Sequence, residues 1–213
     1  KGGLYRTGVI IGFLLFGAVM GIVFVIPLML HALHGLTTDD IGLVMFPGAF
    51  SAVIFGTISG NITAKKGSYF AFSIGFGLIS AALLVLAGLT DKSVWLTSAV
   101  LVMMYIGFSF VQTSMAETIT QSLPVEQIGV GMGFYGLAAF ISGAVGTAGV
   151  ASLLGSSPLG VHLLPFISRP EAHQYSNLML IFAAIVAASG LLYLSTYGKM
   201  RRPAPVQPQI KNG

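Results

Sequence analysis

The sequence predicts an all-α membrane protein in which six transmembrane helices form one bundle. Two features of the composition carry this prediction. Of the 213 residues, 55% are hydrophobic and only 8% are charged, whereas soluble domains carry about 25% charged residues. The mean hydropathy is +0.91. Such a chain cannot cover a surface that faces water, so we expect it to lie in a lipid bilayer.

Six apolar runs are long enough for helices that cross a bilayer core, which needs about 20 residues. In the first break, Thr37 or Thr38 is a candidate N-cap, with Asp39 and Asp40 in the first turn of the next helix. Pro124 ends the fourth run, which is longer than a bilayer requires and should tilt or protrude. The runs are predicted at 8–31, 41–64, 68–89, 94–123, 129–154 and 175–197.

The six runs indicate one helical unit over residues 1–200, followed by a tail at 201–213. The tail reads "RRPAPVQPQIKNG", and we expect it to be disordered and cytoplasmic because it is rich in proline and has no apolar period. The segment between the fifth and sixth runs contains three prolines and is predicted to be a loop. The first residue is lysine and no cleavable leader follows, which indicates a piece of a longer chain.

The positive charges predict which side of the membrane each end occupies. Six spans place the start, the second and fourth breaks and the tail on one side. Only Lys92 and Arg169 fall on the other side. This bias predicts that both chain ends are cytoplasmic. The first side carries eight basic residues: Lys1, Arg6, Lys65, Lys66, Lys199, Arg201, Arg202 and Lys211.

Several function classes are disfavoured by the sequence. The basic residues form no stripe with exposed aromatics, so we expect no nucleic-acid partner. No Gly-x-Ser-x-Gly, His-Glu-x-x-His or phosphate-loop motif occurs, so we expect neither an enzyme nor a bound cofactor. The four histidines fall in or beside the non-cytoplasmic loops, where they should face solvent, and their spacing supports no metal site. They are His31, His34, His162 and His173.

Small residues line two of the predicted helices. Spacing every four residues places them on one helix face, where another helix can approach closely. The second and fifth runs hold corresponding places in a three-plus-three arrangement, and paired glycine-interrupted helices of this kind are typical of transporter repeats. The positions predicted to pack helices are Gly48, Ala52, Gly56 and Gly60 in the second run and Gly143 in the fifth.

The fourth run carries a stripe of polar residues. Ser109, Thr113 and Glu117 recur every four residues and should share one face, with Tyr105 and Gln112 beside it. Lipid cannot satisfy such groups, so the stripe should face protein or a water-filled path. Tyr135 and Ser142 are weaker candidates of the same kind on the fifth run.

Glu117 is the only acidic residue within a predicted span, and such residues are usually functional. It follows Trp95, at the expected outer interface, by 22 residues, which is about 33 Å along a helix. It should therefore lie near the cytoplasmic surface. A structural role at the interface and a role in proton transfer or gating both remain open.

The stretch "GNITAKKGSYFAFSIG" resembles a degenerate loop motif of the major facilitator superfamily. Gly60, Lys65 and Gly67 match that motif, whereas Ala64 stands in place of its Asp and Ser68 in place of its last basic residue. Residues 8–197 further resemble the last six helices of the fourteen-helix drug–proton antiporters, as represented by the Gram-positive tetracycline efflux proteins. The stretches that carry this resemblance are "FGAVMGIVFVIPLML", "LTTDDIGLVMFPGAFSAVIFG", "EQIGVGMGFYGL" and "HLLPFISRPEAHQYSNLMLIF".

The resemblance implies that this chain is the C-terminal half of a transporter in a bacterial plasma membrane. An N-terminal half would face it across a cavity and carry the intact gate motif, because Ala64 cannot fasten a gate. The first, second, fourth and fifth helices would face that cavity or the opposite half, and the third and sixth would face lipid. The cargo would be a drug, exchanged for protons and, for tetracycline, accompanied by a divalent metal.

Two alternatives stay open beside this interpretation. One is a carrier of the same superfamily for another solute, or a multidrug exporter. The other is a membrane scaffold subunit that transports nothing. For a transporter, the candidates for the proton pathway or gate are Glu117, Lys65 and Lys66. The candidates for the substrate cavity are Tyr105, Ser109, Gln112, Thr113, Tyr135 and Ser142.

Overall fold

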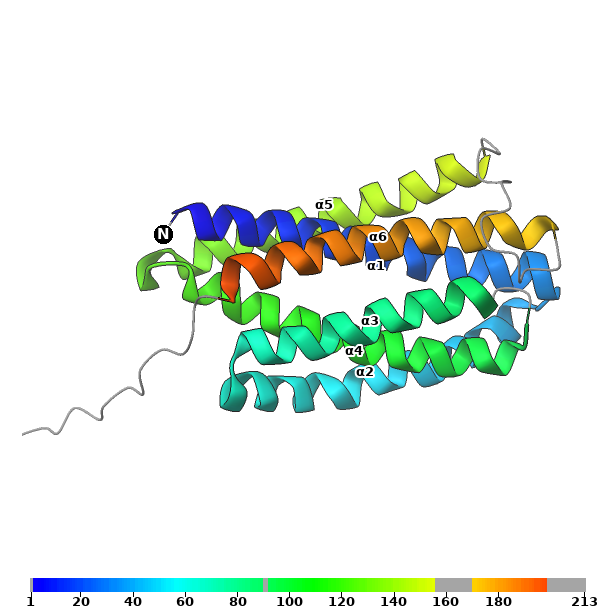
Figure 1. Ribbon diagram of the computed structural model, residues 1–213, viewed down its shortest axis with the longest axis horizontal. Helices are drawn as coiled ribbons and strands as arrows, with labels where there is room; N and C mark the ends of the chain where they lie inside the picture. The colour runs from blue at the N-terminus through cyan, green and yellow to red at the C-terminus, as the bar shows by residue number, and fades with distance from the viewer. Residues whose placement is uncertain (1, 90–91, 156–169, 199–213) are drawn as a thin grey trace, which may run out of the picture.

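The computed structural model describes residues 2–89, 92–155 and 170–198, which form six long helices and one short 3-10 turn (Figure 1). All six helices are long and apolar enough to cross a membrane, and no strand occurs among the described residues. The predicted six-helix fold is therefore confirmed. The helices are α1 (Gly2–His34), α2 (Thr38–Lys66), α3 (Ser68–Leu89), α4 (Val94–Gln121), α5 (Ile128–Gly155) and α6 (Pro170–Tyr197), with the 3-10 turn η1 (Val125–Gln127) before α5.

The largest differences from the predicted spans are at the starts of α1 and α6. α1 begins at Gly2 and runs for 33 residues, or about 50 Å, so it extends beyond the bilayer core. α6 begins at Pro170, because proline is tolerated in the first turn of a helix. The loop predicted for 155–174 is therefore wrong at Gly155, the last residue of α5, and from Pro170 on, where the residues belong to α6. The rest of that segment, 156–169, and the predicted tail at 201–213 lie outside the described residues.

Short connections join α1 to α2 and α2 to α3. Gly35, with φ +64°, follows the end of α1. The Thr37 hydroxyl then accepts a hydrogen bond from the Asp40 N–H while the Asp40 carboxylate accepts one from the Thr37 N–H, forming a capping box that starts α2. A single residue, Gly67, separates α2 from α3. Its φ of +88° favours glycine, since other side chains are strained there.

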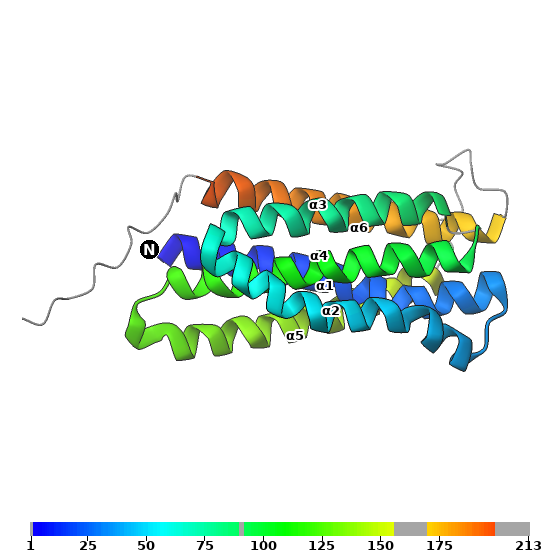
Figure 2. The ribbon, with the colours of Figure 1, turned by 90° about the horizontal axis from the view of Figure 1, so that it is seen from below.

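The helices pack in two layers. α2 packs on α4 and α5 packs on α1, while α1 and α4 contact each other, so these four helices form one layer. α3 packs on α4, α6 packs on α1, and α3 and α6 pack together as the second layer along one side of the bundle (Figure 2). The other side of the four-helix layer, which we call the open face, is covered by no described helix of this chain.

The same packing relates the two halves of the bundle. Exchanging α1 with α4, α2 with α5 and α3 with α6 leaves the pattern of the main helix contacts unchanged. Because the members of each pair are three positions apart in the order of the helices, and successive helices alternate in direction, equivalent helices run in opposite directions. This is the three-plus-three arrangement with inverted repeats that occurs in transporters.

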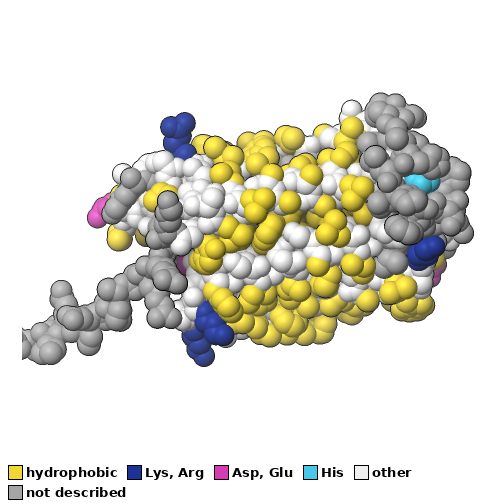
Figure 3. Space-filling view, viewed as in Figure 1, with side chains coloured by type: hydrophobic (Ala, Val, Ile, Leu, Met, Phe, Trp, Pro, Cys, Tyr) yellow, Lys and Arg dark blue, Asp and Glu magenta, His cyan; other side chains and the backbone are white. Residues whose placement is uncertain are grey.

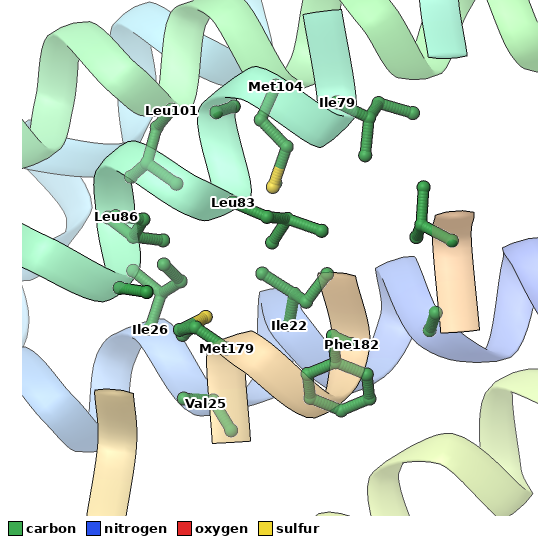
Figure 4. Close-up of a cluster of buried hydrophobic side chains, with 14 of the residues drawn as sticks. Ile22, Val25, Ile26, Ile79, Leu83, Leu86, Leu101, Met104, Met179 and Phe182 are labelled. Atoms are coloured by element: carbon green, nitrogen blue, oxygen red, sulfur yellow. The ribbon is translucent and has the colours of Figure 1, made fainter. Parts of the chain in front are cut away.

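The hydrophobic core lies where α1, α3, α4 and α6 meet, around Ile22, Leu83, Met104 and Met179 (Figure 4). We compare the most apolar stretch of each helix. In α1 and in α4, 50% of the residues of this stretch are buried, but in α2 and in α5 only 17% are. α2 and α5 therefore flank the core and leave most of their apolar surface uncovered.

Charged side chains gather at the two ends of the bundle, and an apolar band separates them (Figure 3). At the end where α1 starts and α2 finishes, the described basic residues are Arg6, Lys65 and Lys66; at the opposite end the described basic residue is Lys92. The described part of the chain thus keeps the predicted excess of positive charge at one end. That this end is cytoplasmic remains a prediction.

Single cysteines at Lys66 and Lys92 test the orientation. The chain contains no cysteine, so each label reports one site. With the positive end inside, Lys92→Cys should react with an impermeant maleimide on intact cells, and Lys66→Cys only after permeabilisation. Labelling of both sites from outside would overturn the predicted topology.

Candidate functional site

Hydroxyl groups join α2 to α4. The Ser109 hydroxyl donates to the carbonyl oxygen of Ala52 at 3.1 Å, and Ser59 Oγ lies 2.9 Å from Thr113 Oγ1. Thr113 also donates to the Ser109 carbonyl at 2.8 Å. Ser109 is buried, so the structure uses Ser109 and Thr113, both candidates for the cavity, as contacts between two helices.

α2 and α4 also approach each other closely at a glycine. A Cβ atom at Gly48 would lie 2.7 Å from Cδ2 of Tyr105 and 3.4 Å from the backbone of Leu101, so α4 packs directly on this glycine. At Gly56 and Gly60, further along α2, no described atom apart from the adjoining backbone of α2 itself lies within 4 Å of the position that a Cβ would occupy. Of the predicted glycine ridge on α2, only the part at Gly48 and Ala52 therefore contacts this bundle.

The residues of the polar stripe on α4 differ in their surroundings along the helix. A residue every fourth position drifts by about 40° per step, because four residues turn through about 400°. Ser109 and Thr113 consequently point toward α2, while Glu117 and Gln121 reach the exposed surface. There the Gln121 amide donates to the Glu117 carboxylate at 2.7 Å. Part of the predicted stripe thus contacts α2 and part is exposed; that the whole stripe lines a path for substrate or protons stays a prediction.

Gln112 projects from the open face. The Phe108 ring packs toward α1, 5.9 Å from the ring of Phe16, and Ser109 bonds to α2. Gln112 follows these two residues by four and three positions, so its direction lies between α1 and α2. Its side chain is exposed. Tyr105, two turns earlier and half-buried, lies on the same side of α4.

The candidates on α5 hold that helix against α1. The buried Ser142 hydroxyl donates to the carbonyl oxygen of Phe13. The Tyr135 ring packs on Gly12, where a methyl group would collide with it. Gly143, where a Cβ would lie 3.2 Å from Met20, also packs on α1. Tyr135 and Ser142 are thus placed in a helix contact, as Ser109 and Thr113 are.

A buried polar cluster that the sequence did not reveal ties α6 to α1 and α4 at the positive end. Thr118 Oγ1 lies 2.7 Å from the Tyr193 hydroxyl, and the Tyr197 hydroxyl donates to the carbonyl of Leu4. The Tyr193 ring stacks on Phe72 with 3.6 Å between centroids. The only signal in the sequence was a threonine and two tyrosines within apolar runs.

One histidine departs from the prediction that all four face solvent. His173 is 2% exposed, because α6 begins at Pro170 and places His173 in its first turn, against the bundle. His162 lies outside the described residues. Among the described residues, no group of three or more His, Asp, Glu or Cys side chains could hold a metal ion.

A groove of about 640 Å³ opens at the positive end between the start of α1 and the connection from α4 to α5. The Tyr5 hydroxyl, which donates to the carbonyl of Gly131 at 2.8 Å, closes one side of it. Its walls are mostly apolar, and Glu126 is the acidic residue that lines it. A smaller apolar groove of about 220 Å³ lies between α1, α5 and α6.

Comparisons with known proteins agree with this architecture. The profile of the Major Facilitator Superfamily matches residues 2–147. A "Tetracycline resistance determinant" of Streptomyces rimosus is 29% identical over 166 residues, which cover 74% of this chain and 48% of that protein. The "Uncharacterized MFS-type transporter YcnB" of Bacillus subtilis (strain 168) is 26% identical over 210 residues, 97% of this chain and 43% of that protein.

The chain therefore spans less than half the length of these two relatives. The matched profile extends from α1 through most of α5, and the six apolar helices make this a multi-pass membrane protein. The chain belongs to the major facilitator superfamily of membrane transporters.

Proposed function

We propose that this chain is the C-terminal half of a drug–proton antiporter in a bacterial plasma membrane, with both of its ends in the cytoplasm. The open face carries the proposal. It consists of α2, α4, α1 and α5 and is not covered by any described helix. An N-terminal half lying against it would cover the apolar surfaces of α2 and α5 and enclose the polar groups between them.

The lining of the open face suits a large, mostly apolar cargo. Gln112 and Tyr105 offer uncharged hydrogen-bonding groups, and Phe16 and Phe108 lie beside them on α1 and α4. Apolar walls with a few placed polar groups are typical of sites for drug-sized molecules. We propose tetracycline as the cargo because one relative is named a tetracycline resistance determinant, and a divalent metal would then travel as part of the cargo.

Glu117 is the proposed link to protons in this half. In the described membrane helices, every other acidic residue lies in the first turn of its helix. Glu117 instead lies four residues before the last residue of α4. Its carboxylate is exposed and bonded to Gln121, so it could accept a proton from water or face the opposite half. Lys65 and Lys66, at the end of α2, are proposed to act at the same cytoplasmic gate.

Glu117→Gln in the complete transporter should reduce proton-driven tetracycline uptake into inverted vesicles by tenfold or more, the usual scale for loss of a proton-transferring group (about 10²-fold). The amide keeps the size and hydrogen-bonding capacity of the side chain but cannot bind a proton. Binding of the drug without a proton gradient should be unchanged. Wild-type uptake with an unchanged pH profile would leave Glu117 a structural residue.

Two further measurements separate the alternatives. This chain expressed alone should confer no resistance, since half of the cavity is missing; resistance without a partner would disprove the half-transporter proposal. Vesicles that show proton-driven uptake of another solute but not of tetracycline would favour a different carrier of the superfamily. No uptake of any tested solute, with normal membrane insertion, would favour a scaffold subunit.

A further inference from the structure

The contact between α2 and α4 keeps a constant register along the two helices. Near the start of both, the Ser98 hydroxyl donates to the carbonyl of Val44 at 2.8 Å. About four turns later, Ser59 Oγ lies 2.9 Å from Thr113 Oγ1. In both pairs the residue on α4 follows its partner on α2 by 54 residues. The two helices therefore run side by side in the same direction, toward the positive end of the bundle.

The next turn of each helix continues this contact. Thr63 follows Ser59 by four residues, and Glu117 follows Thr113 by four. Thr63 and Glu117 are thus also 54 residues apart, the separation of the bonded pairs. Residues four apart lie on nearly the same side of a helix, so the register places Thr63 and Glu117 at one level at the positive end.

Thr63 is buried at this level with its hydroxyl unused. The residue is 5% exposed, and Thr63 Oγ1 makes no hydrogen bond to another described residue. A hydroxyl within a helix can donate to the carbonyl four residues earlier, as those of Ser114 and Thr118 do on α4, at 2.6 Å and 2.7 Å. Thr63 makes no such bond. Buried polar groups without a partner are rare, so this hydroxyl calls for a partner that reaches it in another arrangement of the side chains.

Glu117 is able to supply that partner. Its carboxylate is exposed and accepts a hydrogen bond from the Gln121 amide through Oε1, at 2.7 Å. Rotation about the side-chain bonds of Glu117 turns this carboxylate from Gln121 toward α2. A threonine hydroxyl can donate to an ionised carboxylate and can accept from a protonated one. Thr63 therefore suits Glu117 whether or not Glu117 carries a proton.

We propose that Thr63 is a positioning residue for Glu117, whose carboxylate exchanges one partner, Gln121, for another, the Thr63 hydroxyl. Beside Gln121 the carboxylate is open to water and can exchange a proton. Beside Thr63 it is held at the contact between α2 and α4 and shielded from water. This inference rests on the proposed role of Glu117 in proton coupling, and it adds the group on α2 that fixes the shielded position.

The predicted juxtaposition can be tested without transport. Thr63→Cys combined with Glu117→Cys in the complete protein should form a disulfide on oxidation in membranes, identified by mass spectrometry of the linked peptides. Ser59→Cys with Thr113→Cys is the positive control. Thr63→Cys with Ser109→Cys, about 12 Å out of register along the helix, should not react, since a disulfide needs Cα atoms within about 7 Å. Cross-linking of the positive control but not of Thr63→Cys with Glu117→Cys would overturn the proposal, as would equal cross-linking of the pair that is out of register.

The role of the hydroxyl is tested by proton-driven uptake into inverted vesicles. Thr63→Val removes the hydroxyl at similar size and should lower the maximal rate about tenfold, the scale of one hydrogen bond to a charged group. Drug affinity should not change. The melting temperature should stay the same or rise, because a buried hydroxyl without a partner is removed. Thr63→Ser restores the hydroxyl and should recover most of the rate. A wild-type rate in Thr63→Val, or an equal loss in Thr63→Ser, would contradict the positioning role.

A double variant ties the effect to Glu117. Adding Thr63→Val to Glu117→Gln should lower uptake by less than twofold, because the group that Thr63 positions is already inactive. A further tenfold loss would show that Thr63 acts elsewhere. If Glu117→Gln alone transports at the wild-type rate, the proposed proton coupling fails. If Glu117→Gln is impaired but the Thr63→Cys and Glu117→Cys pair does not cross-link, the proposed function stands and only the positioning role fails.

Discussion

Replacing Gly75 with alanine should destabilise the bundle by about 1–3 kcal/mol, the usual cost of adding a methyl group to a filled contact. Gly75 on α3 faces Gly107 on α4. A Cβ at Gly75 would lie 2.6 Å from the Gly107 carbonyl oxygen and 2.8 Å from the Val111 nitrogen. Both are backbone atoms, so α3 and α4 would have to move apart, and the seam between the two layers of the bundle would loosen.

Gly77→Ala is the matched control. Gly77 is also on α3, but apart from the adjoining backbone of α3 itself no described atom lies within 4 Å of its Cβ position. Alanine is favoured over glycine within a helix by about 1 kcal/mol, so this variant should keep or raise the melting temperature in detergent. The two substitutions should thus shift the melting temperature in opposite directions. Equal shifts would show that α3 and α4 do not approach as closely as described.

The six-helix fold could be predicted because it depends on the length and polarity of whole segments. A helix that crosses lipid needs about 20 apolar residues, and that requirement places each span within a few residues. The starts of α1 and α6 were less predictable. Residues such as Arg6 and His173 are polar and look like loop residues, yet they continue helices that extend beyond the lipid or begin against the rest of the bundle.

The candidate site was less predictable because a polar residue in a membrane helix has two ways to be satisfied. Ser109 and Gln112 are three positions apart, and both look like cavity residues in the sequence. Ser109 instead bonds to the backbone of α2, as small hydroxyl residues do in packed membrane helices, whereas Gln112 projects from the open face. Which neighbour each residue meets depends on the packing of helices distant in the sequence.

The same limitation applies to the glycines. Gly48 and Gly56 belong to one four-residue repeat, but only Gly48 meets another described helix of this chain. Spacing alone predicts a face on which helices can approach. It cannot tell whether the approaching helix belongs to this half, to the proposed opposite half or to neither.

The contrast between Ser109 and Gln112 gives a prediction with two separate measurements. If the open face binds the drug as proposed, Gln112→Ala should weaken drug binding by about tenfold, the equivalent of one hydrogen bond of about 1.4 kcal/mol. It should leave the melting temperature unchanged, since the exposed Gln112 side chain makes no hydrogen bond to another described residue.

Ser109→Ala should have the opposite effects in the complete transporter. Removing its hydroxyl leaves the partly buried carbonyl of Ala52 without this bond, which should lower stability by about 1 kcal/mol. Drug binding, measured by tryptophan quenching or equilibrium dialysis, should stay within about twofold of the wild type. If both variants lose affinity equally, the contact between α2 and α4 opens during binding and Ser109 lines the cavity after all. If Gln112→Ala binds the drug as tightly as the wild type, the open face between α1 and α2 is not the drug site.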